Sequence, residues 1–302
     1  MSGISTNRTN LTIPTEVSED IMQKVVGTSA IMQLAQRIEL PGRGLTIPTI
    51  TGDPEASWVD ETDQKPTANP TIGTKNMKGY TLSVIVPFSN QFRRDMRTLY
   101  QAIVDRLPGA LAKKFDATVI GSSAPGTGFD VLGSCTAQKL VPGVGETVYG
   151  NLVAAWEDIA AHGGALDGFA LSPAAEGILL KSVDSTGRPI FMGSTASNDP
   201  SPILGARVVR GRGLYVSGVA PVGTGAGTPA VVGIAGDWTK ARYGVVESDV
   251  RISISEEATV TINSTPVNLW ERNMFAVRAE IEVGFVADTE CFNRLTGATP
   301  AS

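Results

Sequence analysis

The sequence predicts an α+β protein with two lobes and two long extensions. Three observations lead to this prediction. The C-terminal part alternates apolar and polar residues with the period of β-strands, residues 92–121 carry one helical stripe, and two N-terminal stretches are too polar to form a core. A chain of 302 residues is also near the length at which a single hydrophobic core stops growing.

The composition limits the chemistry that the chain could perform. Hydrophobic residues make up 42% and charged residues 18%, which is enough for a core and too little charge for a disordered chain. The net charge of −5 argues against extensive nucleic-acid binding but leaves local basic patches open. The one histidine cannot build a histidine-rich zinc site, and Cys135 and Cys291 form no CxxC pair, so we expect reduced thiols, no metal and no cofactor.

Residues 1–14 are polar and predict an extended arm. They contain no apolar segment of the kind found in secretory signals, and no apolar run in the chain is long enough to span a membrane. Apolar residues between Thr15 and Leu40 predict a short helix opened by Ser18, a break near residues 27–28, and then more helix or strand. We expect residues 1–44 to act together as an N-terminal arm.

Residues 45–86 predict a long two-stranded hairpin that leaves the body. Apolar residues alternate along both flanks, near Leu45 and again from Leu82 to Val86. The polar middle carries five acidic residues against one lysine: Asp53, Glu55, Asp60, Glu61 and Asp63, with Lys65. Trp58 would be exposed there in a monomer, and tryptophan is favoured as an interface anchor. The simplest interpretation is that this hairpin lies on another subunit.

The strongest helical pattern comes next. Its apolar residues follow one face, with Ser89 as the expected N-cap, a kink or brief interruption at Pro108, and an end at Gly121. The stripe consists of Phe92, Met96, Leu99, Ile103, Leu107, Leu111, Phe115 and Val119. The opposite side is basic and includes Arg93, Arg94 and Arg97, which on its own indicates a solvated helix face.

The rest of the chain divides into two parts. From residue 122 to about 233, helices expected at 151–162 and 173–182 and a strand at 169–172 predict a separate α/β lobe. A basic cluster there would contact phosphate or an acidic neighbour, or lie solvated along a strand edge: Arg207, Arg210 and Arg212. Antiparallel strands with one wet face are then expected at 251–255, 259–262 and 275–285, with the long helix on the other face.

No pattern predicts a catalytic residue. Gly121–Gly128 lacks the lysine of a phosphate-binding P-loop, Pro229 follows the glycines at 223–227 where a dinucleotide site needs a helix, and no GxSxG is present. A catalytic triad would need His162, which precedes two glycines and is expected to cap a helix. A carboxylate pair stays open. A soluble α+β hydrolase is therefore the remote alternative.

The order of these features resembles the major capsid proteins of tailed bacteriophages with the Hong Kong 97-type fold. The resemblance extends from about Leu11 to Leu295. It depends on five segments: Ala56–Glu61 in the hairpin, Asp116 and Gly121 near the helix end, Leu180–Pro189, Gly236-Asp237-Trp238, and Phe275–Gly284. Each is weak alone, and their order and spacing make the match specific.

The resemblance implies a peripheral domain with a long spine helix on an antiparallel sheet, an axial α/β domain, an N-terminal arm and an extended E-loop hairpin. The expected division is 1–44 for the arm, 45–86 for the E-loop, 87–121 for the spine helix, 122–235 for the axial domain, and 236–302 for the peripheral return strands and C-terminus. The implied role is structural rather than enzymatic. Copies would form pentamers and hexamers of an icosahedral virion shell, assembled in the host cytoplasm.

The resemblance also implies partners. They are other copies of the chain, separate scaffolding, cement and portal proteins, and packaged double-stranded DNA in weak non-specific contact, with no membrane. Scaffolding would be a separate protein or a segment already removed before Met1. A related alternative is an encapsulin-like nanocompartment shell. The charges add a hypothesis, in which Trp58 and the acidic Asp60, Glu61 and Asp63 contact the basic Arg93, Arg94 and Arg97 of an adjacent subunit.

Overall fold

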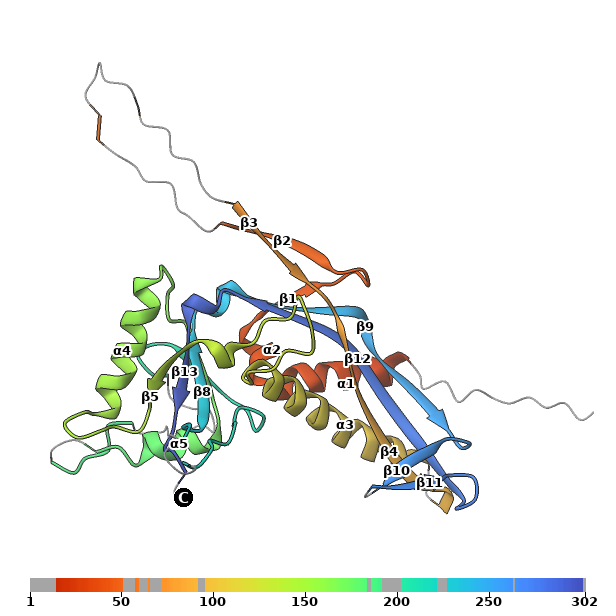
Figure 1. The fold of residues 1–302 in the computed structure, drawn as a ribbon. Coiled ribbons are helices and arrows are strands. Elements are labelled where there is room, and N and C mark those ends of the chain that lie inside the picture. The colour runs from red at the N-terminus through yellow and green to blue at the C-terminus, as the bar shows by residue number, and fades with distance from the viewer. Residues whose placement is uncertain are drawn as a thin grey trace, which may run out of the picture.

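The computed structural model describes residues 15–50, 58–59, 65, 72–91, 96–183, 186–191, 202–221, 227–262 and 264–300. These residues form an α+β protein with two mixed sheets and helices packed against them, as predicted (Figure 1). A hairpin extends away from the body (Figure 1). Within the described residues, no helix combines the length and apolar character needed to cross a membrane.

The first sheet has the strand order β1-β9-β12-β4. These strands span Gln36–Glu39 (β1), Ala241–Ser255 (β9), Met274–Ala287 (β12) and Tyr80–Ser89 (β4). β1 pairs with β9 in parallel, and the other pairs are antiparallel. In β12, Val277 and Phe285 are fully buried whereas Arg278 is exposed, which confirms the predicted alternation. A two-stranded ribbon of β10 (Thr259–Ile262) and β11 (Thr265–Asn268) stands apart from this sheet.

Three helices complete this part of the body: α1 (Thr15–Thr28), α2 (Ala30–Leu34) and α3 (Met96–Val119). Apolar residues of α1, α2 and α3 share one core with β9 and β12. α1 packs on α3 and β9, whereas α2 packs on the strands at 168–171 and 207–210 of the second sheet. Ile21 and Ile31 are fully buried there. The stretch expected to be an arm through residue 44 is therefore part of the core from residue 21 onward. α1 also begins at Thr15, before the expected cap at Ser18.

The helix expected to begin near Ser89 starts later. Pro87 and Ser89 belong to β4, which is an edge strand, so a proline that cannot donate a hydrogen bond is tolerated there. Pro108 lies within α3, which continues through it rather than being interrupted. The C-terminal half of the predicted stripe is confirmed, because Leu107 and Phe115 are both buried in the core.

The second sheet has the order β5-β13-β8-β6-β7. Its strands and helices are β5 (Thr136–Lys139), α4 (Val148–Ala161), β6 (Gly168–Leu171), α5 (Pro173–Leu180), β7 (Arg207–Arg210), β8 (Val231–Gly236) and β13 (Phe292–Thr296). The predicted mixture of helices and strands is present in this region, but β13 pairs with β5 and β8 in this sheet. The expectation that the chain after residue 236 stays with the first sheet is wrong for these residues.

Two neighbouring connections join the sheets. β8 leads into β9 through a short 3-10 helix at Trp238–Lys240, and β12 leads into β13 through another at Thr289–Cys291. Trp238 is buried and donates from Nε1 to the carbonyl of Gly168 at 2.9 Å. Asp237 Oδ2 accepts from the amide of Ala165 at 3.0 Å. The Gly-Asp-Trp turn between β8 and β9 is thus hydrogen bonded to the first residue of β6 and to the loop before it.

Candidate assembly interface

The hairpin consists of β2 (Leu45–Ile50) and β3 (Ile72–Met77), paired antiparallel. The sequence pattern assigned residues 82–86 to its second strand. That assignment is wrong, because β4 pairs with β12 in the first sheet. Figure 1 shows the hairpin leaving the body at the end of this sheet.

A small core attaches the hairpin to the body. Ile47 and Met77 of the hairpin are buried together with Leu40 and Val286. The turn before β2 requires glycine at position 44, where φ is +89° and a Cβ would lie 2.8 Å from the Met77 carbonyl oxygen. These contacts determine the direction in which the hairpin leaves the sheet.

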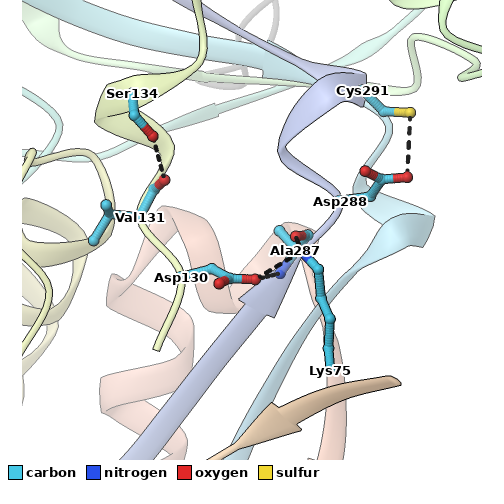
Figure 2. A network of polar contacts seen from close by, with 7 residues as sticks. All are labelled: Lys75, Asp130, Val131, Ser134, Ala287, Asp288 and Cys291. Carbon is cyan, nitrogen blue, oxygen red and sulfur yellow. Dashed lines mark hydrogen bonds and ion pairs between the residues drawn. The ribbon is translucent and has the colours of Figure 1, made fainter. Parts of the chain in front are cut away.

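A lysine of β3 adds a polar anchor (Figure 2). Lys75 Nζ donates to the carbonyl of Ala287 at 2.6 Å and forms an ion pair with Asp130 Oδ2 at 3.1 Å. The same oxygen accepts from the Ala287 amide at 3.1 Å. The Lys75 and Asp130 side chains are 37% and 30% exposed, so each contact adds only about 1 kcal/mol or less to stability. Their geometry nevertheless joins β3 to the end of β12 and to the loop after α3.

The structure describes only part of the predicted contact set. Trp58 lies between β2 and β3, and its side chain is fully exposed. Arg97 belongs to the first turns of α3. The other predicted contact residues lie outside the described residues: Asp60, Glu61, Asp63, Arg93 and Arg94. The contact between the acidic hairpin and the basic helix therefore stays a prediction.

Exposed aromatic residues mark surface that the sequence analysis missed. Tyr149 and Trp156 are each 48% exposed on α4, and Trp270 is 75% exposed between β11 and β12. On the same helix Leu152 and Ile159 are buried, so Trp156 lies on the other side from the apolar face that packs on the body. The seven-residue spacing of Tyr149 and Trp156 was the available signal, because it places both on one helix face. Exposed aromatic side chains of this kind are enriched in protein interfaces.

A buried carboxyl connects α3 to the N-terminal helices. Asp116 is 1% exposed, its Oδ1 accepts from Ser29 Oγ at 2.5 Å, and its Oδ2 accepts from the Ala30 amide at 3.1 Å. Ser29 is the N-cap of α2, and its hydroxyl oxygen in turn accepts from the Met32 amide at 3.1 Å. Burial raises the pKa of Asp116 to about 6, although these hydrogen bonds oppose the shift. The arrangement fixes α2 on α3.

The histidine and the two cysteines make contacts that support the fold. His162 ends α4, with Nδ1 2.8 Å from the Asp158 carbonyl oxygen, which confirms the predicted cap. Cys135 and Cys291 are free and buried, and burial raises the pKa of both thiols, that of Cys135 to about 12. Cys291 Sγ lies 3.8 Å from Asp288 Oδ2 (Figure 2). Thiols with raised pKa values are poor nucleophiles at neutral pH. Within the described part of the chain, no group of three or more His, Cys, Asp or Glu residues could hold a metal ion.

Comparisons with known proteins point to one family. The model of the phage capsid family matches residues 9–295. The chain is 28% identical over 294 residues to a probable major capsid protein of Mycobacterium phage L5, which covers 93% of this chain and 88% of that protein. It is 25% identical over 302 residues to the major capsid protein of Staphylococcus phage 80alpha, with 95% of this chain and 85% of that protein covered.

Two solved structures show the same fold. A chain of Mycobacterium phage Adephagia matches with a TM-score of 0.67 at 19% identity, covering 100% of this chain and 96% of that one. The capsid of an empty GTA particle matches with a TM-score of 0.61 at 16% identity, covering 90% of this chain and 97% of that one. The family match extends over both sheets and over the hairpin, so this chain belongs to the phage capsid family and is a major capsid protein of tailed phages.

Proposed function

We propose that copies of this chain form pentamers and hexamers that close an icosahedral shell around double-stranded DNA, assembled in the host cytoplasm. The observation that carries this proposal is the β2–β3 hairpin, which leaves the body and exposes Trp58 completely. A hairpin with few supporting contacts needs another surface to lie on. Contacts from one copy to the next around a ring supply that surface, and they close when the rotation per copy divides a full turn. Separate scaffolding, cement and portal proteins are the further partners of such a shell.

We assign the Hong Kong 97-type division of the chain with adjusted boundaries. The E-loop narrows from 45–86 to 45–77, because β4 pairs within the first sheet. The first sheet with α3 as spine helix forms the peripheral domain, and the second sheet forms the axial domain with residues 292–296 included. The strand pairing supports this division. In it the two domains share the buried turn at Trp238 rather than being joined by a linker.

The ring contact that we propose combines one hydrophobic anchor with complementary charge. Trp58 and the backbone of the hairpin supply most of the affinity, because exposed ion pairs each contribute only about 0–1 kcal/mol. Asp60, Glu61 and Asp63 then select the register against the basic start of the neighbouring spine helix, at Arg93, Arg94 and Arg97. Charge complementarity of this kind affects the specificity and rate of assembly more than its strength.

A charge-swap experiment tests this contact. Asp60→Lys with Glu61→Lys reverses the charge of the hairpin residues, and Arg93→Glu with Arg94→Glu reverses the charge at the start of the helix. Each pair alone should lower the yield of shells counted by electron microscopy, and the four changes together should restore it. Wild-type yield from either pair alone would refute the electrostatic part.

The nucleic-acid content of the particles tests the rest of the proposal. Shells from infected cells should contain double-stranded DNA. Shells that contain an enzyme cargo and no DNA would instead indicate a nanocompartment. A chain that stays a small oligomer under all conditions would refute the shell itself.

A further inference from the structure

A cavity of about 630 Å³ lies between α3, the start of α5 and the loop that follows β7. Three cationic residues line it, namely Lys113 of α3, Arg210 at the end of β7 and Arg212 in the loop. In Figure 1, α3 and α5 lie on the side of the body away from the β2–β3 hairpin. Lys113 lies 16 residues along α3 from Arg97, about 24 Å at 1.5 Å per residue, so the cavity is separate from the start of α3 that is proposed to contact the hairpin of a neighbouring copy.

The loop after β7 lies so close to α3 that it must contain glycine. A Cβ at Gly213 would lie 2.5 Å from the carbonyl oxygen of Lys113 and 2.8 Å from Asp116 Cβ. A Cβ at Gly211 would likewise lie within 3.0 Å of neighbouring side chains. Arg212 stands between these two glycines and is exposed. The close backbone contact thus holds one arginine side chain at the mouth of the cavity, beside a lysine of the helix.

The acidic groups near the cavity are already hydrogen bonded within the chain. Glu176 pairs with Arg210 at 2.6 Å, and the buried carboxylate of Asp116 accepts hydrogen bonds from the start of α2. Within the described part of the chain, the side chains of Lys113 and Arg212 have no hydrogen-bond or ion-pair partner. Three cations stand against two carboxylates, and neither Lys113 nor Arg212 forms an ion pair with either carboxylate. A cavity with this balance attracts an anion.

We propose that this cavity binds phosphate groups, and that in the shell its ligand is the phosphodiester backbone of packaged duplex DNA. The identity of the ligand rests on the proposed function. Guanidinium and ammonium groups are the usual protein ligands of phosphate, and such contacts carry no sequence information, as a container requires. Two or three contacts per subunit make the affinity of one copy low and strongly dependent on salt. A chain with a net charge of −5 would in this way attract DNA at one place and repel it elsewhere.

The test compares DNA binding by two double variants with the same loss of charge. Lys113→Gln with Arg212→Gln removes the cavity cations, and Arg43→Gln with Lys139→Gln removes two exposed cations elsewhere. Binding of a fluorescent 30-base-pair duplex by the full unassembled chain is followed by anisotropy from 20 to 150 mM NaCl. The slope of log K against log salt should become shallower by about 2 in the cavity variant and stay unchanged in the control. Equal slopes in all three proteins would overturn the proposal.

Two further measurements separate the source of the phosphate from other ligands. Inorganic phosphate alone is titrated calorimetrically, and a cavity that binds it while the duplex slope stays unchanged would overturn the assignment to DNA. In intact particles, Lys113 should react more slowly with an amine-acylating reagent when the shell is full of DNA than when it is empty. Equal reactivity in the two would also overturn the assignment.

Assembly of the cavity variant keeps this inference distinct from the proposed function. Normal shells with a reduced salt slope would support the inference and leave the shell proposal intact. A folded variant that binds DNA normally and forms no shells would show that the cavity holds an acidic segment of a neighbouring copy. That outcome would overturn the inference while supporting the shell.

Discussion

Replacing Asp116 by asparagine tests how a buried carboxyl shapes the stability of this chain. Burial raises the pKa of Asp116 from 3.8 to about 6 in the folded chain. Between these two pH values the folded chain binds more protons than the unfolded chain, so the free energy of unfolding falls as the pH rises. At about 1.36 kcal/mol per pKa unit the whole effect is about 3 kcal/mol, of which roughly 2 kcal/mol falls between pH 4 and pH 6. Asparagine cannot ionise, so the variant should lack this loss.

Asparagine at position 116 can keep the hydrogen bonds of this site, whereas alanine cannot. The asparagine oxygen can accept from the Ala30 amide, and its NH2 group can donate to the Ser29 hydroxyl oxygen. Alanine would leave two buried donors, the Ala30 amide and the Ser29 O–H, without their acceptor. Asp116→Ala should therefore lower the free energy of unfolding at every pH, by about 1–3 kcal/mol for each unpaired group.

The assay is urea unfolding of the unassembled chain at pH 4, 5, 6 and 7, followed by tryptophan fluorescence, with sedimentation to confirm that no shells are present. The difference in unfolding free energy between wild type and Asp116→Asn removes contributions from distant titrating groups. We expect this difference to shift by about 2 kcal/mol in favour of the variant from pH 4 to pH 6. A constant difference across this range would refute the raised pKa.

Three further predictions concern the hairpin and the turn between the sheets. Lys75→Met should change the unfolding free energy by about 1 kcal/mol or less yet lower the yield of shells. Lys78→Met, at an exposed position of the same segment, should leave both quantities unchanged. Unfolding curves and particle counts check this prediction, and equal shell yields from the two variants would contradict it. Gly236→Ala should lower the free energy of unfolding by about 1–3 kcal/mol or more, because the added Cβ would lie 2.1 Å from a ring carbon of Phe292 in β13. Gly27→Ala has open space around the added Cβ and should change the free energy of unfolding by under about 1 kcal/mol. Thermal unfolding compares the two variants. Trp58→Ala should leave the melting temperature of the unassembled chain unchanged and weaken ring formation by about 2 kcal/mol or more, measured by sedimentation; a lowered melting temperature would place this side chain in the fold instead.

Hydrophobic periodicity predicted the elements that pack on the core. Val277 and Phe285 are buried on one side of β12, and Leu107 and Phe115 are buried on one side of α3, because a residue's face follows directly from its spacing along the chain. His162 was likewise predictable as a cap, since the signal is the pair of glycines next to it. Such features depend on residues only a few positions apart.

Strand partners could not be predicted in the same way. Residues 80–89 alternate as well for a hairpin strand as for the sheet strand that they form with β12, nearly two hundred positions later. The strand at 292–296 shows no local sign of which sheet it joins. Alternation identifies the buried face of a strand and contains no information about its neighbour.

At the candidate interface, too, the features that depend on neighbouring residues were predictable and those that depend on distant residues were not. Trp58 stood out because a tryptophan in a polar, acidic stretch is unusual in a monomer. The anchor at the base of the hairpin was not visible, because Lys75 is 55 positions from Asp130 and 212 from Ala287. Charges that meet only through the fold leave no pattern along the chain.

The base of the hairpin matters for assembly because a small change of angle there produces a large displacement at a distance along the hairpin. Trp58 is 17 residues before Lys75, and a fully extended strand of that length would span about 56 Å. A tilt of about 10° at the base would move a point at that distance by roughly 10 Å, about twice the spacing between neighbouring strands. The half-exposed bonds of Lys75 to Asp130 and Ala287 contribute little energy, yet they limit this tilt. Because water can replace such bonds at small cost, the base can also adopt slightly different angles, as the proposed use of one chain in both pentamers and hexamers would require.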